Sequence, residues 1–187
     1  MHSRIFQLSL KPIPSENYIK DTDSIFDEFV GSIADYENAS ENSWAFRNVS
    51  YDLLRAFGSI EDDKITWLPK EKLQEVYFKG RYEIFKSEAL GLAGASFEAF
   101  AGNDRTTQEV LENMLFGLRS AYKDDYDVYI IVSRQEVNEN GLLKYGHIYS
   151  APEFESDDYF LMTFDTFMRC IDASHEYYIG AVLDYHF

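Results

Sequence analysis

The stretch YDVYIIVS, residues 126–133, most restricts the fold of this 187-residue chain. Its residues 128–132 form an unbroken apolar run, which is typical of a strand that is covered on both faces. Such a strand needs neighbouring strands and a packing layer on each side. The following sequence supplies them, because residues 158–164 (DYFLMTF) and 176–187 (EYYIGAVLDYHF) also have the composition of strands.

Further elements are predicted along the whole chain. The alternation in RIFQLSL, residues 4–10, indicates a strand that ends at Pro12, and KITWL, residues 64–68, indicates a short one. The turn signal NENG predicts an antiparallel hairpin over residues 126–149. Helices are predicted over residues 21–36, 50–58, 70–90, 110–122 and 165–175, with a capping box formed by Thr106 and Glu109 and a possible kink or break at Gly80.

Strands that cluster late, with helices between some of them, favour the α+β class. We expect a single domain over residues 1–187, with a mixed or antiparallel sheet packed against about four helices. The pattern of GLAGASFEAFAGN, residues 91–103, fits either close helix packing or a loop. The predicted buried sheet residues are Val128, Ile130, Val132, Ile148, Leu161, Ile179 and Val182.

The formal charge of −16 decides which classes of partner are plausible. Residues 14–63 hold 12 acidic and three basic side chains, and residues 107–187 hold 15 and five. This charge opposes direct binding to nucleic acid and to anionic membranes, since both gain affinity when their own negative charge is neutralised. Only residues 64–106, with seven basic and six acidic side chains, offer a local basic face as an alternative.

Cysteine usage and hydropathy give an expected location. Cys170 is the only cysteine, so no internal disulfide is possible, and a single thiol fits a reducing compartment. The apolar part of residues 1–18 is too short and too interrupted for a signal peptide, and no stretch reaches the roughly 20 apolar residues of a membrane span. A cytoplasmic location is therefore expected.

No motif selects a catalytic centre or a cofactor. The glycines of residues 91–102 lack the Lys-Ser/Thr of a phosphate loop and the spacing of a dinucleotide-binding fingerprint, so no cofactor is predicted. Asp184 and His186 would share one face of a strand, with His147 as a third metal ligand. Against this weak metal site stands the simpler interpretation of a surface-exposed terminal strand.

The remaining feature is acidic and aromatic surface. The stretch APEFESDDYF, residues 151–160, sets four carboxylates among three rings and contains no basic residue. If residues 153–157 were extended, alternate carboxylates would line one side about 6.6 Å apart. A solvated connection is the alternative, and EDD at 61–63 and KDDYD at 123–127 offer similar surfaces. The candidate partner-binding residues are Glu153, Phe154, Glu155, Asp157, Asp158, Tyr159, Glu61, Asp62, Asp63, Asp124, Asp125 and Asp127.

These observations favour a non-enzymatic acidic protein that blocks a basic site on a partner protein, for example on a nucleic-acid-binding effector. Two examples fit equally well: a nucleic-acid mimic that inhibits a defence nuclease such as a restriction or CRISPR effector, and an immunity protein against a basic toxin. The alternative is a small metal-dependent or acid/base enzyme whose site is assembled only in three dimensions. A third possibility is an assembly subunit that pairs through an open terminal strand. The sequence assigns no oligomeric state.

Overall fold

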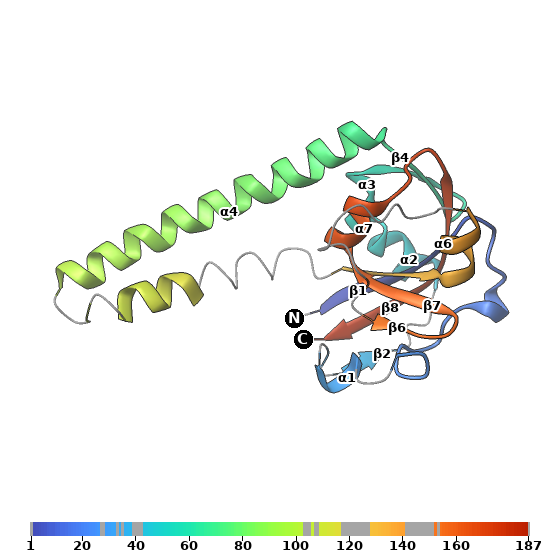
Figure 1. Ribbon diagram of the computed structural model, residues 1–187, viewed down its shortest axis with the longest axis horizontal. Coiled ribbons are helices and arrows are strands. Elements are labelled where there is room, and N and C mark those ends of the chain that lie inside the picture. Colours follow the sequence, from blue (N-terminus) through green and yellow to red (C-terminus); the bar gives the residue numbers. More distant parts are fainter. Residues whose placement is uncertain are drawn as a thin grey trace. The chain divides into compact units, whose positions relative to one another are not determined.

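The computed structural model (Figure 1) describes residues 2–26, 29–32, 34, 36–38, 43–102, 106, 109–116, 128–140, 152 and 154–186. The fold is α+β, with a mixed sheet and helices, as predicted. The chain forms two compact units, Met1–Gln74 with Asp127–Phe187 and Glu75–Tyr126. We describe them separately, and a single domain over residues 1–187 stays a prediction.

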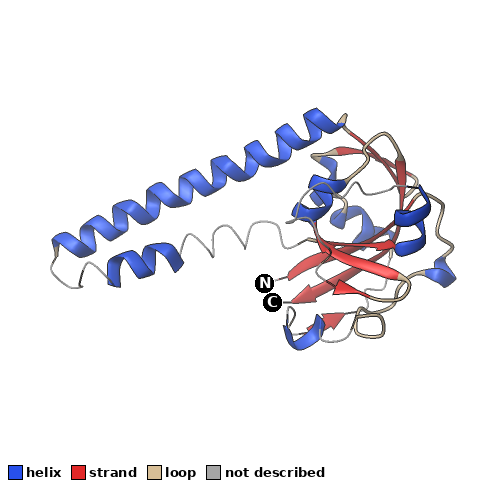
Figure 2. Ribbon diagram, in the orientation of Figure 1, coloured by secondary structure: helices blue, strands red, loops and turns tan. Residues whose placement is uncertain are grey.

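The first unit contains the sheet, drawn as red arrows in Figure 2. Its strand order is β3-β4-β8-β1-β5-β7-β6, and β2 also pairs with β8. The β1–β5 pair is parallel and the other pairs are antiparallel. The strands are β1 His2–Ser9, β2 Tyr36–Asn38, β3 Gly58–Glu61, β4 Lys64–Trp67, β5 Tyr129–Ser133, β6 Phe154–Glu155, β7 Tyr159–Thr163 and β8 Glu176–His186.

Short helices accompany the sheet in the first unit. Two of them begin with side-chain caps: Ser43 accepts from the N–H of Phe46, and Thr163 accepts from the N–H of Thr166. The helices of this unit are the 3-10 helix η1 Ser15–Asn17, α1 Phe29–Ser32, α2 Trp44–Ser50, α3 Asp52–Arg55, α6 Arg134–Asn140 and α7 Phe164–Cys170.

Apolar side chains cover both faces of the sheet. On one face Phe29 packs edge-to-face against Tyr129 and Tyr185, with ring centroids 5.5 and 5.7 Å away. Elsewhere in the core, Phe167 of α7 packs against Trp67 and Tyr177. The burial predicted for Val128, Ile130, Val132, Leu161, Ile179 and Val182 is confirmed, and Ile148 lies outside the described residues.

The terminal strand β8 is central in the sheet. It pairs with β1 on one side, and with both β4 and β2 on the other. The prediction of a surface-exposed terminal strand is therefore wrong, and the idea of assembly through an open β8 edge loses its basis. The central position of β8 could not be predicted from the sequence, because the order of strands along the chain does not determine their order in the sheet.

A β-bulge interrupts the pairing of β8 with β1. The register shifts between Phe6 and Leu8, so that Gly180 and Ala181 together face Gln7. The Oε1 atom of Gln7 accepts from the N–H groups of Ala181 and Ile19, at 3.0 and 3.2 Å. The buried Gln7 side chain thus satisfies the Ala181 N–H, which lies in the bulge, and the N–H of Ile19, which lies outside the strands.

Buried Arg47 satisfies the backbone on the other edge of β8. Pairing with β4 ends at Tyr178 and pairing with β2 begins at Asp184, and Arg47 binds the strand between them. Its guanidinium donates to the carbonyl oxygens of Ile179, at 2.9 Å, and of Gly180. Because these carbonyls are buried, Arg47 substitutes for an absent strand neighbour.

The helix predicted over residues 21–36 is wrong. The described part contains only α1, and Gly31 inside it has a φ of 99°. Local polar bonds compete with a helix here, since the Asp21 carboxylate accepts from the N–H of Ser24 at 2.7 Å. The helical spacing of the apolar residues instead belongs to an irregular layer in which Phe26 and Phe29 are buried.

The hairpin predicted over residues 126–149 is also corrected. The chain leaves β5 directly into α6, and the strands beside β5 are β1 and β7. The pattern Ser133-x-x-Glu136 has the spacing of a helix start, and this competes with the turn signal of NENG. The second predicted strand, residues 142–149, lies outside the described residues.

The second unit, Glu75–Tyr126, is helical where it is described. Helix α4, Lys70–Ala101, begins in the first unit and runs without a break through Gly80 and residues 91–101, where a loop was the alternative. The predicted capping box is confirmed: the Glu109 carboxylate accepts from Thr106 N–H at 2.8 Å, and Thr106 Oγ1 accepts from Glu109 N–H at 3.3 Å. Residues 109–116 are helical.

Among the described residues, no helix combines the length and apolar character needed to cross a bilayer.

Candidate functional site

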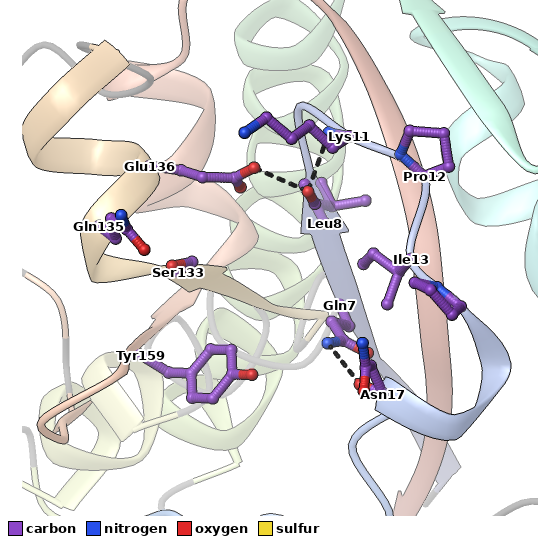
Figure 3. A pocket seen from close by; sticks show the side chains of 12 residues that line it. Gln7, Leu8, Lys11, Pro12, Ile13, Asn17, Ser133, Gln135, Glu136 and Tyr159 are labelled. Atoms are coloured by element: carbon purple, nitrogen blue, oxygen red, sulfur yellow. Dashed lines mark hydrogen bonds between the residues drawn. The ribbon is translucent and has the colours of Figure 1, made fainter.

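A groove of about 430 Å³ lies at the carboxyl ends of the parallel strands β1 and β5. Figure 3 shows its walls: the end of β1 and the segment after it, the end of β5, the start of α6, and Tyr159 of β7. The chain bends at Leu10 and Lys11 directly after β1, and Pro12, which has no N–H to donate to a neighbouring strand, follows the bend. It lies entirely within the first unit.

Glu136 contributes a half-buried carboxylate to this groove. Its Oε1 atom accepts from the Ser9 hydroxyl at 2.8 Å and from the Leu10 N–H at 3.2 Å. Among the described residues, no basic side chain forms an ion pair with it. The carboxylate is thus held by two neutral donors, without a countercharge.

Polar groups also line the opposite part of the groove. Gln7 is only 5% exposed, and its Nε2 atom donates to the Asn17 carbonyl at a long 3.4 Å. The Tyr159 hydroxyl points toward these two residues in Figure 3. Burial raises the pKa of Tyr159, and the negative charges of Asp158 and Glu136 raise it further. The hydroxyl is therefore neutral at pH 7 and lies in a negative field.

The acidic turn, which we define as residues 156–159, leads from β6 into the first residue of β7, Tyr159, and borders the groove there. Arg134 fixes this turn: its guanidinium donates to the Ser156 carbonyl at 2.8 Å, and its backbone N–H donates to the Asp158 carbonyl at 2.9 Å. The Ser156 N–H in turn donates to the Tyr159 carbonyl at 2.9 Å. The turn is therefore ordered before any partner binds.

The acidic stretch differs from the extended ridge considered from its sequence. Among the described residues of 153–157, only Phe154 and Glu155 are in a strand, and the chain bends at Asp157 and Asp158 before β7 begins. Glu155 has a basic neighbour after all, since the Arg134 guanidinium lies 3.4 Å from its carboxylate. Asp157 and Asp158 are exposed, and among the described residues neither carboxylate forms an ion pair. Glu153 lies outside the described residues.

The second acidic stretch lies at the other edge of the sheet. Glu61 and Asp62 are exposed at the β3–β4 turn, where Asp62 and Asp63 have positive φ angles of 48° and 59°. The Asp63 carboxylate already has partners within the chain: it accepts from the Tyr51 hydroxyl and lies 3.2 Å from the Arg47 guanidinium.

The structure does not bring the two described acidic turns together. The turn at residues 61–63 joins β3 to β4, and the turn at residues 156–159 joins β6 to β7, at opposite ends of the strand order. Six strand spacings of about 4.8 Å put these edges roughly 29 Å apart. Asp124, Asp125 and Asp127 lie outside the described residues. Each turn must therefore be treated as a separate surface.

The weak metal site has a different environment from the one considered. Asp184 binds Arg4 through one carboxylate oxygen, while its other oxygen lies 3.1 Å from Nδ1 of His2. The His2 and His186 rings are in edge contact, with centroids 5.2 Å apart. His147 lies outside the described residues, and the described ones contain no cluster of three or more metal-ligating side chains. These contacts form a side-chain cluster around the Arg4–Asp184 ion pair, with His2 and His186 beside it.

Comparison with known proteins gives no relatives from which a function can be transferred. No family model, no curated protein and no solved structure matches the chain.

Sequence reasoning missed Glu136 and Arg134, although it selected Tyr159 and the acidic turn. The Ser133-x-x-Glu136 spacing is a local signal that predicts the start of α6 and so places both side chains beside β5. No local signal indicates that Glu136 reaches Ser9, 127 residues away in the chain.

Proposed function

We propose that this chain is a non-enzymatic binding protein that uses the acidic turn to occupy a basic site on a partner protein. The partner class is a nucleic-acid-binding effector, such as a restriction or CRISPR nuclease, or a basic toxin. The observation that carries the proposal is the pair Asp157 and Asp158, exposed without ion partners among the described residues on a turn that Arg134 holds rigid.

Rigidity matters because an ordered surface loses little conformational entropy on binding. Arg134 of α6, which binds this turn, also lies over the ring of Phe160 in β7, with its guanidinium carbon 4.7 Å from the ring centroid. Two carboxylates therefore project from a surface whose backbone is already fixed. Exposed charges of this kind contribute little to folding stability, so their cost to the monomer is low.

The charge of the whole chain supports the same interpretation. A formal charge of −16 steers basic partners toward the protein and accelerates their association at low salt. The acidic turn then places two carboxylates at fixed positions, which net charge alone does not do. If the turn is the binding surface, reversing its charges should weaken binding more than reversing two charges elsewhere; if only the net charge acts, both changes should weaken binding equally.

The test uses the double variant Asp157→Lys/Asp158→Lys and a charge-matched control, Glu71→Lys/Glu75→Lys, on exposed positions of α4. Both variants change the formal charge by the same amount. Purified restriction endonucleases, Cas9-type effectors and basic toxin nucleases are each mixed with a labelled DNA duplex, and fluorescence anisotropy reports displacement of the DNA by the protein.

We expect the wild-type protein to displace DNA from one of these effectors and the turn variant to be weaker by about tenfold or more, mainly through slower association. The control should lose much less. Equal losses in both variants would show that net charge acts without the turn. Failure of the wild-type protein with every effector would contradict the proposal.

A further inference from the structure

We infer that the groove beside the acidic turn receives the cationic end of one arginine or lysine side chain of the partner, with the cation bound at Glu136. The inference rests on the proposed function, because it names the part of a basic partner that this surface recognises. The inference gives a role to the groove, which the proposed function leaves without one.

The first argument is the unbalanced charge of Glu136. Its carboxylate is half-buried, and its donors among the described residues are Ser9 and Leu10, which are both neutral. A carboxylate has about four lone-pair directions, so acceptor capacity remains after these bonds. Partial burial of an uncompensated charge is unfavourable, and an entering cation would remove that penalty.

The second argument is the composition of the walls. Leu8, Pro12, Ile13 and Pro14 supply apolar surface, while Glu136 supplies the charge. Lysine and arginine have the matching construction of an apolar stem and a charged end. The volume of about 430 Å³ is near the lower end of the usual range for small-ligand pockets, which suits one side chain with part of its backbone.

The third argument is the sign of the local field. Asp158 and Glu136 both raise the pKa of the Tyr159 hydroxyl, so negative potential from the turn extends into the groove. Lys11 also lines the groove, but the structure shows no ion pair between it and Glu136. Arginine is the favoured occupant, because its guanidinium is less strongly hydrated than an ammonium and binds carboxylates through two parallel hydrogen bonds.

The test is an NMR titration of the full chain with Nα-acetylarginine amide. Nα-acetylcitrulline amide is the matched probe, because it has nearly the same shape without the charge. Nα-acetyllysine amide separates the two cations. The reporters are the side-chain amide of Gln7 and the ring of Tyr159, which both line the groove.

We expect saturable shifts of both reporters with the arginine probe, weaker ones with lysine, and none with citrulline. Glu136→Gln retains an acceptor for Ser9 and Leu10 and should weaken arginine binding by about tenfold. Tyr159→Phe provides a second groove variant if Glu136→Gln unfolds. The control Glu71→Lys/Glu75→Lys should leave the titration nearly unchanged.

Shifts confined to the backbone of the acidic turn, or equal shifts with citrulline, would overturn the inference. A partner assay separates it from the proposed function. If only the groove is wrong, Glu136→Gln will leave effector binding unchanged while Asp157→Lys/Asp158→Lys still weakens it by about tenfold or more. If the proposed function is wrong, the wild-type protein will bind no effector, whatever the arginine probe does.

Discussion

At the scale of single residues, Gly180 has a strict requirement for a small side chain. It lies in the β-bulge of β8 and faces Gln7 and Ile13, two residues that line the groove. A Cβ atom at this glycine would lie 2.6 Å from Gln7 Oε1 and 2.6 Å from Ile13 Cδ1. Gln7 cannot move freely, because its Oε1 atom holds the N–H groups of Ile19 and Ala181. The glycine is therefore required by close approach.

We predict that Gly180→Ala lowers the free energy of unfolding by about 1–3 kcal/mol, the usual cost of overpacking a core. Gly80→Ala is the control, since a Cβ at this position of α4 meets no atom within 4 Å. That change should be neutral or stabilising by up to about 1 kcal/mol, because alanine favours helix. Urea unfolding measures both, and similar values for the two variants would contradict the close contact at Gly180.

Residue-scale sequence reasoning identified the acidic turn but not what surrounds it. The exposure of Asp157 and Asp158 follows from their charge, and the structure agrees. The pairing of Glu155 with Arg134 was not foreseeable from APEFESDDYF, because the partner lies 21 residues earlier in the chain. Contacts over such distances depend on strand order, which local composition does not contain.

At the scale of elements, the sequence predicted those with strong local signals. The strands β1, β4, β7 and β8, the helix α7, and the cap at Thr106 and Glu109 all follow from alternation or capping chemistry. The failures at residues 21–36 and 126–149 each have a local competitor. Polar bonds such as that of the Ser24 N–H to Asp21 compete with the predicted helix, and the helix-start spacing of Ser133 and Glu136 competes with the turn signal of NENG.

The element whose removal should matter most is β8, because it joins β1 to both β4 and β2. We predict that a chain ending before residue 176 loses cooperative thermal unfolding, as measured by circular dichroism. Without this strand, the backbone N–H and C=O groups of β1 and β4 that face β8 lose their hydrogen-bond partners. A synthetic peptide of residues 176–187, added to the truncated chain, should restore part of the transition. An unchanged melt of the truncated chain would contradict the central role of β8.

At the scale of the whole molecule, net charge and fold act against each other. A charge of −16 on 187 residues repels itself in the compact state, while the apolar layers on the sheet hold that state together. The ion pairs Arg4–Asp184 and Arg47–Asp63 fix local geometry, but even if every basic residue paired with one acid, 16 acidic side chains would remain, since there are 33 acidic and 17 basic residues. The same excess that would attract a basic partner must therefore weaken folding at low ionic strength.

We predict that added NaCl stabilises the protein at pH 7. Raising the salt from 0.01 M to 1 M shortens the screening length from about 30 Å to about 3 Å, which removes repulsion between exposed acids that are far apart. The urea midpoint should therefore rise with salt. The control is the same titration near pH 4.5, the isoelectric point of the sequence, where the net charge is close to zero and the rise should largely vanish. An equal rise at both pH values would assign the effect to apolar hydration, and the acidic excess would then carry no measurable cost to folding.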